Sequence, residues 1–384
     1  MIDKDELLLI PGPTTLSSRV REVMSRPQQS HVAPEFYSAF KELLGLARYA
    51  FGNKDGLQYV FTGSGSIGME STVISLLEHG DKVLSIETGH FGERFSMMAE
   101  IHGARVEKMV SEKSHHIDYD LVNSTLKKGG FKAVLFTHVD TSTSVMNDPV
   151  KLCSIAHDNG ALAICDSVCG IGGARLNFDE IRADVALTGS QKAIAAPPGA
   201  TLLAVSKHAY EIMEKRKTPI QSYYMNLLRW KPIMDEPKIY LTTPAVQIML
   251  ALREALLEVK EEGIENRWKR HEILAEAFRS GLEALNLKPF ADKESRAPTV
   301  TAFYVQKGRS GEIQETLRTK HGVHVAMGFG DYKDYMLRVG HFGNISSTDV
   351  LALLGALELT LSGSSNIRQG VALESAMPLL ESLK

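Results

Sequence analysis

Cysteine, tryptophan and long hydrophobic runs are all scarce in this sequence of 384 residues. It contains three cysteines and two tryptophans. Cys153, Cys165 and Cys169 cannot all pair with one another, and their spacing matches no common zinc pattern, so we predict neither a disulfide scaffold nor a metal site. The cysteines instead indicate a reduced, cytoplasmic protein.

An excess of charge of one sign is also missing. Lysine and arginine number 43 and aspartate and glutamate number 46, which gives a formal net charge of −3. Without a basic surplus to neutralise a phosphate backbone, we expect no nucleic-acid partner. The most apolar stretch, residues 349–361, is too short to cross a bilayer and contains Asp349 and Glu358, and the acidic N-terminus does not resemble a secretory signal. We therefore expect no membrane partner either.

What the sequence does contain is an alternation of short apolar runs and helical patterns. These runs are almost continuously apolar and do not alternate with polar residues, which is typical of strands buried on both faces. Their order predicts βαβ units and a mainly parallel sheet in an α/β fold. The expected strands cover residues 59–61, 82–86, 133–137, 161–165, 184–188 and 201–205.

The last third of the chain has a different character. Residues 245–285 are rich in Ala, Leu, Glu and Lys, and they predict one or two long helices interrupted only by Gly263 and Gly281. Two more strands are expected at residues 299–305 and 335–339. We therefore expect an N-terminal arm (residues 1–20), a large α/β domain (21–260) and a smaller α+β domain (261–384).

One group of glycines forms a motif that could bind a phosphate. Residues 63–68, Gly-Ser-Gly-Ser-Ile-Gly, satisfy G-x-G-x-x-G between an expected strand and an expected helix. Glu87 lies 19 positions after Gly68, which suits the ribose-binding acid of a dinucleotide site. However, glycines at a helix N-terminus suit any phosphate group. The motif alone leaves open a nicotinamide or flavin cofactor, another phosphate-bearing cofactor, or a plain tight turn.

Two later residues narrow the choice of cofactor. Asp166 directly follows the expected strand 161–165, and Lys192 follows the expected strand 184–188. Because parallel sheets place ligands at the carboxyl ends of their strands, both side chains are expected at one rim, together with the hydroxyls of residues 141–143. A carboxylate and an amine there suit pyridoxal 5'-phosphate. A lysine forms a Schiff base with its aldehyde, and an aspartate keeps its ring nitrogen protonated.

Five short motifs run in order through most of the chain. They are Leu9-Ile10-Pro11-Gly12-Pro13-Thr14, Thr62-Gly63-Ser64-Gly65, Asp166-Ser167-Val168, Gly189-Ser190-Gln191-Lys192-Ala193 with Pro197-Pro198-Gly199, and Leu337-Arg338-Val339-Gly340. In this combination the sequence resembles the class V aminotransferases, and specifically their serine–pyruvate/alanine–glyoxylate group. The resemblance implies the fold type I of pyridoxal-phosphate enzymes, with a mainly parallel seven-stranded sheet in the large domain and a smaller α+β C-terminal domain.

The resemblance also assigns residues to the cofactor. Lys192 corresponds to the Schiff-base lysine, and Asp166 to the partner of the ring nitrogen. Phe91 corresponds to the aromatic residue that stacks on the ring, where tryptophan is common in the family. Thr141 corresponds to a hydroxyl near the ring oxygen or the substrate. The phosphate is expected on Ser64, Gly65, Ser66 and Gln191, although the family often has histidine at the position of Ser66.

Further residues are implied for the substrate and for a second subunit. Arg338 corresponds to the arginine that clamps the substrate α-carboxylate through two parallel hydrogen bonds, and a buried salt bridge is the alternative. His31 is expected near the substrate entrance. Tyr240 and Thr243 correspond to residues that reach the phosphate of the neighbouring subunit, which implies a homodimer with shared active sites.

Together these expectations predict an aminotransferase that moves an amino group from serine or alanine to glyoxylate or pyruvate with ping-pong kinetics, Lys192 acting as general base. Three alternatives stay open at this point. A pyridoxal-phosphate β-eliminase would use the same Lys192 and Asp166. An NAD-dependent dehydrogenase would use residues 63–68 and Glu87 and leave Lys192, Asp166 and Arg338 unexplained. A binding protein without a cofactor would leave the same three residues idle.

Overall fold

A central sheet organises most of the chain in the computed structural model, which describes residues 6–239, 241–362 and 368–383. Its strands are β2 (Leu57–Thr62), β3 (Lys82–Glu87), β4 (Arg105–Val110), β5 (Phe131–Thr137), β8 (Leu162–Asp166), β9 (Val185–Gly189) and β10 (Ala200–Val205). Among the described residues these seven strands follow the spatial order β2-β10-β9-β8-β5-β3-β4. Neighbours run parallel except at β10, which is antiparallel to both β2 and β9. The prediction of a mainly parallel, seven-stranded sheet is confirmed.

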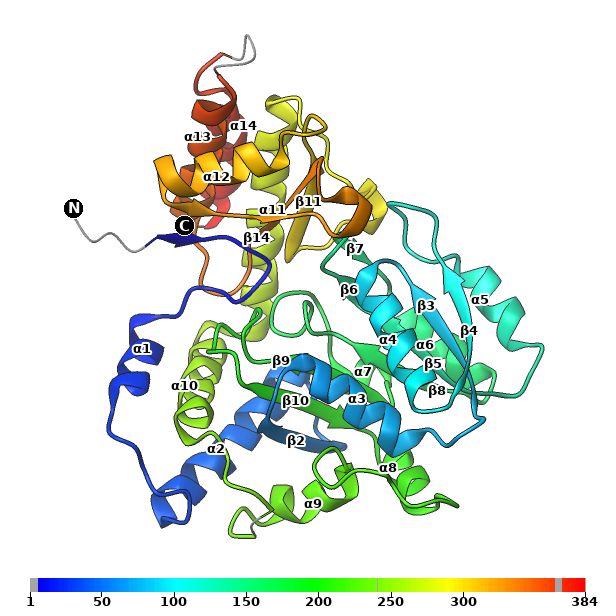
Figure 1. Ribbon diagram of the computed structural model, residues 1–384. Coiled ribbons are helices and arrows are strands. Elements are labelled where there is room, and N and C mark those ends of the chain that lie inside the picture. The colour runs from blue at the N-terminus through cyan, green and yellow to red at the C-terminus, as the bar shows by residue number, and fades with distance from the viewer. Residues whose placement is uncertain (1–5, 240, 363–367, 384) are drawn as a thin grey trace.

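Helices cover both faces of this sheet (Figure 1). Successive strand residues point to opposite faces, so that Leu202 and Ala204 pack into one hydrophobic cluster and Leu203 and Val205 into another. Burial on both faces explains why the strand sequences do not alternate. The first face is covered by α2 (Pro34–Phe51), α5 (Tyr119–Leu126), α6 (Pro149–Asp158), α7 (Phe178–Ile181) and α10 (Val246–Glu262), and the second by α3 (Gly65–Leu76), α4 (His90–Ile101), α8 (Lys207–Glu214) and α9 (Leu227–Asp235).

Strand β4 is missing from the strands expected from individual sequence runs. It lies at the edge of the sheet, and Met109 is its one buried residue. Its sequence, Arg-Val-Glu-Lys-Met-Val, therefore carries charged residues and lacks the apolar run that marks an interior strand. By contrast, β8, β9 and β10 are buried along their whole length.

A third hydrophobic cluster forms beyond Gly263. The helical segment expected at residues 245–285 consists of two helices, because Gly263 adopts a φ of +82° between α10 and α11 (Ile264–Ala284). Gly281 does not interrupt α11. A Cβ at Gly281 would lie 2.5 Å from Leu354, so the glycine lets a neighbouring helix approach closely. The remaining elements of this part are β11 (Val300–Tyr304), α12 (Ser310–His321), β12 (Val323–His324), β13 (Ala326–Met327), β14 (Met336–Gly340), α13 (Ser347–Leu361) and α14 (Val371–Leu380), with β11, β14 and β13 forming an antiparallel sheet in that order.

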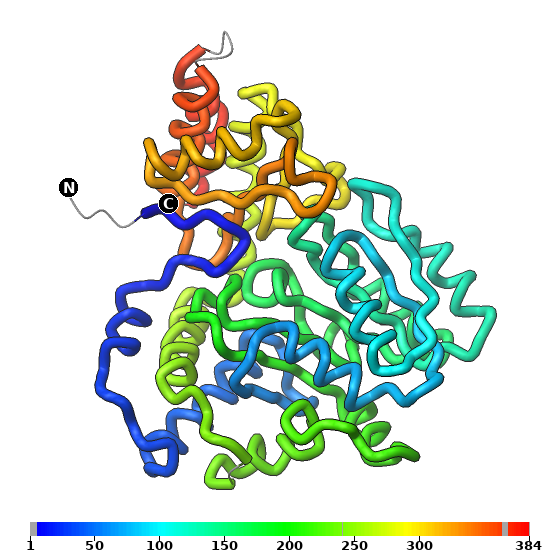
Figure 2. Tube along the Cα trace, in the orientation of Figure 1, coloured from blue at the N-terminus to red at the C-terminus, as the bar shows by residue number. Residues whose placement is uncertain are grey.

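The N-terminal segment connects the two parts of the molecule (Figure 2). Its strand β1 (Leu7–Leu8) pairs in parallel with β12, and Leu9 joins the hydrophobic cluster of α11 and α13. Helix α1 (Ser18–Ser25) then packs against α10, where Arg19 forms an ion pair of 2.7 Å with Glu254. The domain boundaries at residues 20 and 260 stay predictions, and the break at Gly263 lies close to the second.

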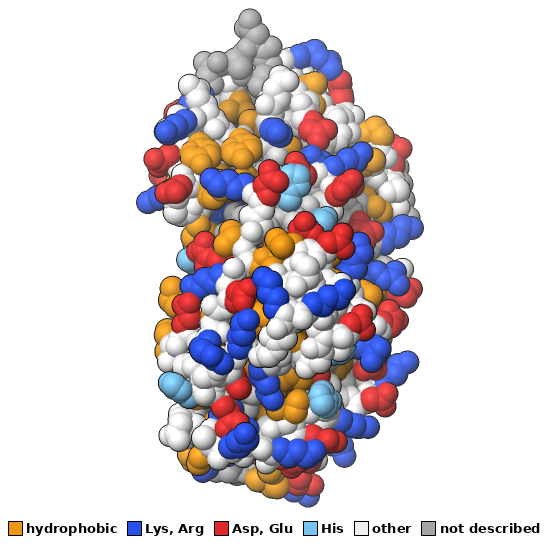
Figure 3. Space-filling model, turned by 90° about the vertical axis from the view of Figure 1, so that its right-hand side faces the viewer, with side chains coloured by type: hydrophobic (Ala, Val, Ile, Leu, Met, Phe, Trp, Pro, Cys, Tyr) orange, Lys and Arg blue, Asp and Glu red, His pale blue; other side chains and the backbone are white. Residues whose placement is uncertain are grey.

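The surface carries no dominant charge on the side that Figure 3 shows, where positive and negative side chains are interspersed. This mixture agrees with the net charge of −3. Within the described residues, no helix is both long enough and apolar enough to cross a membrane.

Candidate active site

Asp166 and Lys192 lie at the same edge of the central sheet. Asp166 is the last residue of β8 and pairs with Leu187 of the adjacent parallel strand β9, which ends at Gly189. Lys192 follows three residues later. Because the two strands run parallel, both side chains lie at their carboxyl ends, and their charges influence each other's pKa.

The loop that covers Lys192 depends on a glycine. Lys192 Nζ donates a hydrogen bond to the carbonyl of Pro11. A Cβ added to Gly12 would lie 2.6 Å from Lys192 Cδ and 2.8 Å from Nζ, and Gly12 has a φ of +96° that other residues rarely adopt. The N-terminal Pro-Gly-Pro motif is thus explained by the lysine that it packs against.

The environment of Lys192 favours its neutral form. Burial lowers the pKa of Lys192, Arg338 and Arg94 lower it further, and Cys169 and Asp166 oppose the shift. Only a neutral amine can bond to an aldehyde or accept a proton. The site therefore prepares Lys192 for either role.

Asp166 is a buried carboxyl group with no cationic partner among the described residues. It is 4% exposed and accepts a hydrogen bond of 2.9 Å from the backbone N–H of Val168. No ion pair within 4.0 Å involves it in the described ranges. Burial raises the pKa of Asp166 to about 7, with Asp140 adding to the shift and Lys192 and Arg94 opposing it. A protonated ring nitrogen would supply the missing cation, so this residue fits a pyridine-type cofactor.

The glycine motif forms the start of α3, as expected. Ser64 precedes the helix, is exposed, and makes no capping hydrogen bond with its side chain. A Cβ on Gly65 would lie 2.8 Å from Val168, so this helix start approaches the turn after β8. Nearby in sequence to Lys192, Gln191 Oε1 is buried without a hydrogen-bond partner among the described residues. The N–H groups of Gly65 and Ser66 at a helix N-terminus fit a phosphate group.

Asp140, which the sequence analysis did not single out, anchors the start of α4. Its buried carboxylate accepts hydrogen bonds from the backbone N–H groups of Phe91 at 3.0 Å, Gly92 at 3.2 Å and Ser142 at 2.9 Å. This contact fixes Phe91 in the first turn of α4, with the guanidinium of Arg94 4.7 Å from the centre of its ring. The sequence signal that could have found Asp140 is its position directly before the Thr-Ser-Thr segment at the sheet edge.

His138 is a second residue that was missed. Its backbone N–H donates to the carbonyl of Asp166 at 2.8 Å, and its Nδ1 lies 2.9 Å from Ser167 Oγ. Burial lowers the pKa of His138 to about 4, so the ring is neutral at neutral pH. A single histidine after an apolar strand carries no specific pattern, and only its proximity in the fold reveals that it supports the Asp166 segment.

Arg338 is a buried cation on β14 with 7% of its surface exposed. Its Nε donates to the carbonyl of Met327 at 2.9 Å and Nη1 donates to the carbonyl of Thr141 at 3.1 Å. The alternative of a buried salt bridge is not seen, since no described carboxylate lies within 4.0 Å of the guanidinium. Burial lowers the pKa of Arg338 to about 10, so the group is still charged at neutral pH. A buried cation without a counter-ion suits an anionic ligand such as a carboxylate.

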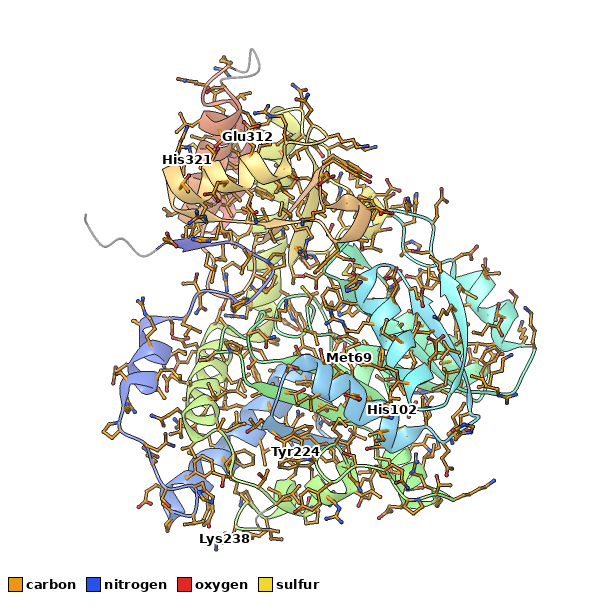
Figure 4. The ribbon with its side chains drawn as sticks, in the orientation of Figure 1. Met69, His102, Tyr224, Lys238, Glu312 and His321 are labelled. Atoms are coloured by element: carbon orange, nitrogen blue, oxygen red, sulfur yellow. The ribbon has the colours of Figure 1, made fainter. Side chains whose placement is uncertain are left out.

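His31 lies close to the carboxyl end of β2, and Thr243 lies close to the start of α10. His31 lines an apolar cavity with Thr62, Trp230 and Lys238, and Lys238 lies at the lower edge of the molecule in Figure 4. Thr243 is exposed shortly before α10. Tyr240 lies outside the described residues. The roles expected for these residues stay predictions.

One alternative function loses its support in the geometry. Glu87, which a dehydrogenase would use to bind a ribose, accepts a hydrogen bond of 2.5 Å from Ser96 Oγ within the protein. The dehydrogenase leaves three other residues unexplained. Asp166 and Lys192 lie at the carboxyl ends of β8 and β9, and Arg338 on β14 donates a hydrogen bond to the carbonyl of Thr141, which follows β5.

Comparison with known proteins shows the family of this chain. The family model of class-V aminotransferases matches residues 16–336. The chain is 35% identical to an uncharacterised aminotransferase of Methanocaldococcus jannaschii, over 93% of this chain and 92% of that protein. It is 32% identical to the alanine–glyoxylate aminotransferase of Oryctolagus cuniculus, over 92% of each chain. The crystal structure of ureidoglycine–glyoxylate aminotransferase from Bacillus subtilis superposes with a TM-score of 0.95 at 29% identity, over 99% of each chain.

These matches confirm the resemblance inferred from the five motifs, including the fold type I architecture and the cofactor pyridoxal 5'-phosphate. The buried Asp166 and the helix start at Gly65 have the chemistry that the ring nitrogen and the phosphate of this cofactor require, and their roles stay predictions. The chain belongs to the class-V aminotransferase family.

Proposed function

We propose that this aminotransferase moves the amino group of alanine or serine to glyoxylate or pyruvate. The observation that carries the proposal is Arg338, a buried guanidinium that has two carbonyl contacts and no carboxylate partner among the described residues. All four proposed substrates carry one carboxylate beside the reacting carbon, which such a group would bind. The similarity to an alanine–glyoxylate aminotransferase supports the choice of small substrates.

The roles proposed for the remaining residues come from the resemblance to the family, and their positions are compatible with them. Pyridoxal 5'-phosphate supplies an electron-withdrawing ring that stabilises negative charge at the substrate α-carbon. Lys192 Nζ removes the α-proton and returns it, which its lowered pKa favours. The Asp166 carboxylate would keep the ring nitrogen protonated, and Phe91 would stack on the ring. Ser64, Gly65, Ser66 and Gln191 would hold the phosphate. Thr141, whose carbonyl accepts a hydrogen bond from Arg338, would present its hydroxyl near the ring oxygen or the substrate.

Half-reactions test this proposal. Incubating the protein with alanine alone should yield about one pyruvate per subunit and then stop until glyoxylate is added, because each step of a ping-pong reaction needs its own partner. Serine alone should release no ammonia. Continuous ammonia release from serine without an acceptor would contradict the proposal and favour the β-eliminase.

We further propose a homodimer in which Tyr240 and Thr243 complete the phosphate site of the other subunit. Two observations support it: Thr243 is exposed, and the adjoining cavity lined by His31, Trp230 and Lys238 is largely apolar. The cytoplasmic location inferred from the three cysteines stays a prediction.

Mixing two inactive variants tests the shared site. Lys192→Ala and Tyr240→Ala, unfolded and refolded together, should recover roughly a quarter of the wild-type activity, because random pairing makes half of the dimers mixed and each mixed dimer has one intact site. Each variant refolded alone is the control. No recovery, in a mixture that light scattering shows to be dimeric, would contradict shared sites.

A further inference from the structure

The guanidinium of Arg338 has three described contacts, two with carbonyl groups and one with an aromatic ring. Two carbonyl groups accept hydrogen bonds from its Nε and Nη1, as described above. In addition, the centre of its guanidinium lies 4.2 Å from the centre of the Phe329 ring. Aromatic contact with a planar guanidinium fixes the plane of the group, which hydrogen bonds to carbonyls leave partly free.

Phe329 also contacts two aromatic residues at the start of α4, in the part of the molecule that contains the central sheet. Its ring stacks against the imidazole of His90, with the centres 5.0 Å apart and the planes at 25°. Its edge also contacts Phe91, at 6.0 Å and 80°. His90 and Phe91 begin α4, whereas Phe329 precedes β14 on the other side of the site. Phe329 thus joins the arginine of one part to the aromatic residues of the other.

Ordinary hydrophobic burial does not explain this residue. Phe329 remains 36% exposed and belongs to none of the hydrophobic clusters of buried residues in the described structure. It also borders a cavity that includes His90, Ser142 and Thr143, next to Thr141. The partly exposed ring of Phe329 therefore contacts Arg338 and borders the candidate active site.

We propose that Phe329 is a positioning residue that orients the Arg338 guanidinium to bind the substrate α-carboxylate. The proposal rests on the proposed function, in which Arg338 binds that carboxylate. With Nε and Nη1 bonded to carbonyls and the guanidinium face covered by Phe329, the N–H groups left for a ligand lie in a defined plane. A carboxylate binds best when both of its oxygens lie in that plane. Phe329 thereby acts on every substrate that carries a carboxylate, whether amino acid or 2-oxo acid.

The test compares ligands that contain the carboxylate with one that lacks it. For Phe329→Ala, we expect KM to rise about tenfold for both alanine and glyoxylate, which corresponds to about 1.4 kcal/mol, with kcat changed much less. The rate with isopropylamine, an amine shaped like alanine but without a carboxylate, should be unchanged. The Kd of propionate, a carboxylate that cannot react, should rise by the same factor in calorimetry.

Three further variants sharpen the result. Phe329→Tyr keeps the ring and should restore wild-type values, whereas Phe329→Leu keeps apolar bulk without a π face and should behave like the alanine variant. Tyr49→Ala removes an aromatic residue of α2 with the same 36% exposure and should change nothing. Phe329→Leu also serves if Phe329→Ala fails to fold.

The outcomes separate the possibilities. Equal losses with alanine and isopropylamine would indicate a general structural role and overturn the proposal, as would unchanged values with every ligand. If propionate binding weakens in Phe329→Ala but wild type does not use alanine, the positioning role stands and the proposed substrates are wrong.

Discussion

Replacing Lys192 with alanine should lower the rate of amino-group transfer by about 10⁴-fold or more, because the variant loses both the amine that bonds to the cofactor and the general base. The effect should fall on kcat rather than on the affinity for the α-carboxylate, which Arg338 supplies. Steady-state kinetics with alanine and glyoxylate measures it. Borohydride reduction followed by mass spectrometry should attach the cofactor to Lys192 in wild type and not in the variant.

Two controls show whether the loss of activity is specific to the amine of Lys192. Lys215 follows α8, forms an ion pair with Glu211, and has a side chain that is 75% exposed. Lys215→Ala should leave the rate unchanged. Added methylamine should restore part of the lost rate in Lys192→Ala, because a free amine can accept the proton. Normal turnover of Lys192→Ala without added amine would exclude the proposed role.

Replacing Asp166 with asparagine should lower kcat by roughly 10²–10³-fold and at the same time stabilise the protein prepared without cofactor. The loss of activity is expected because a neutral amide cannot stabilise a protonated ring nitrogen, and losing one partner of a buried ion pair costs about 3–5 kcal/mol. Steady-state kinetics measures this loss. Asp235→Asn, at an exposed site paired with Lys231, is the matched control and should keep full activity.

The stability effect should depend on pH. Burial raises the pKa of Asp166 to about 7 in the folded protein, above that of an aspartate in the unfolded chain, which is about 3.9. Between these values the folded state binds more protons, so this group reduces the stability progressively as pH rises from about 4 to about 7. Without cofactor, Asp166→Asn should therefore have a higher Tm than wild type at pH 8, and the advantage should vanish near pH 4.

Cofactor should reverse this order. A bound cation beside Asp166 favours its ionised form, so wild type with pyridoxal 5'-phosphate should gain more in Tm than Asp166→Asn does. Thermal unfolding at pH 8, with and without cofactor, gives all four values. Equal gains in the two proteins would mean that Asp166 does not meet the ring.

The prediction from sequence succeeded for positions that depend on a residue's place after a strand, whereas the roles of those residues stay predictions. Lys192 and Asp166 were assigned because an amine and a carboxylate follow two apolar runs, and parallel strands bring such ends together. The interior strands were found because burial on both faces demands apolar residues throughout. The edge strand β4 was not predicted, because most of its side chains are not buried and its sequence therefore contains charged residues instead of an apolar run.

Other parts of the site could not be predicted from local patterns. Asp140 and His138 look like ordinary loop residues in the sequence, and their importance comes from the backbone groups that they bond in the fold. The competing salt bridge for Arg338 could be set aside only once its surroundings were known. The dimer contacts expected of Tyr240 and Thr243 stay predictions, because they depend on a second chain.

By itself, the sequence predicted the family, the cofactor and the positions of the interior strands along the chain, because five motifs carry the resemblance and burial on both faces gives each of these strands an apolar run. The order of the strands in the sheet came from the structure. Tertiary structure alone decided that Gly12 packs on Lys192, that Thr141 accepts a hydrogen bond from Arg338, and that Phe329 lies between that arginine and α4. The physical reason is sequence distance. Gly12 and Lys192 are far apart in the chain, as are Thr141 and Arg338, so only the packing of the two parts against each other brings them into contact.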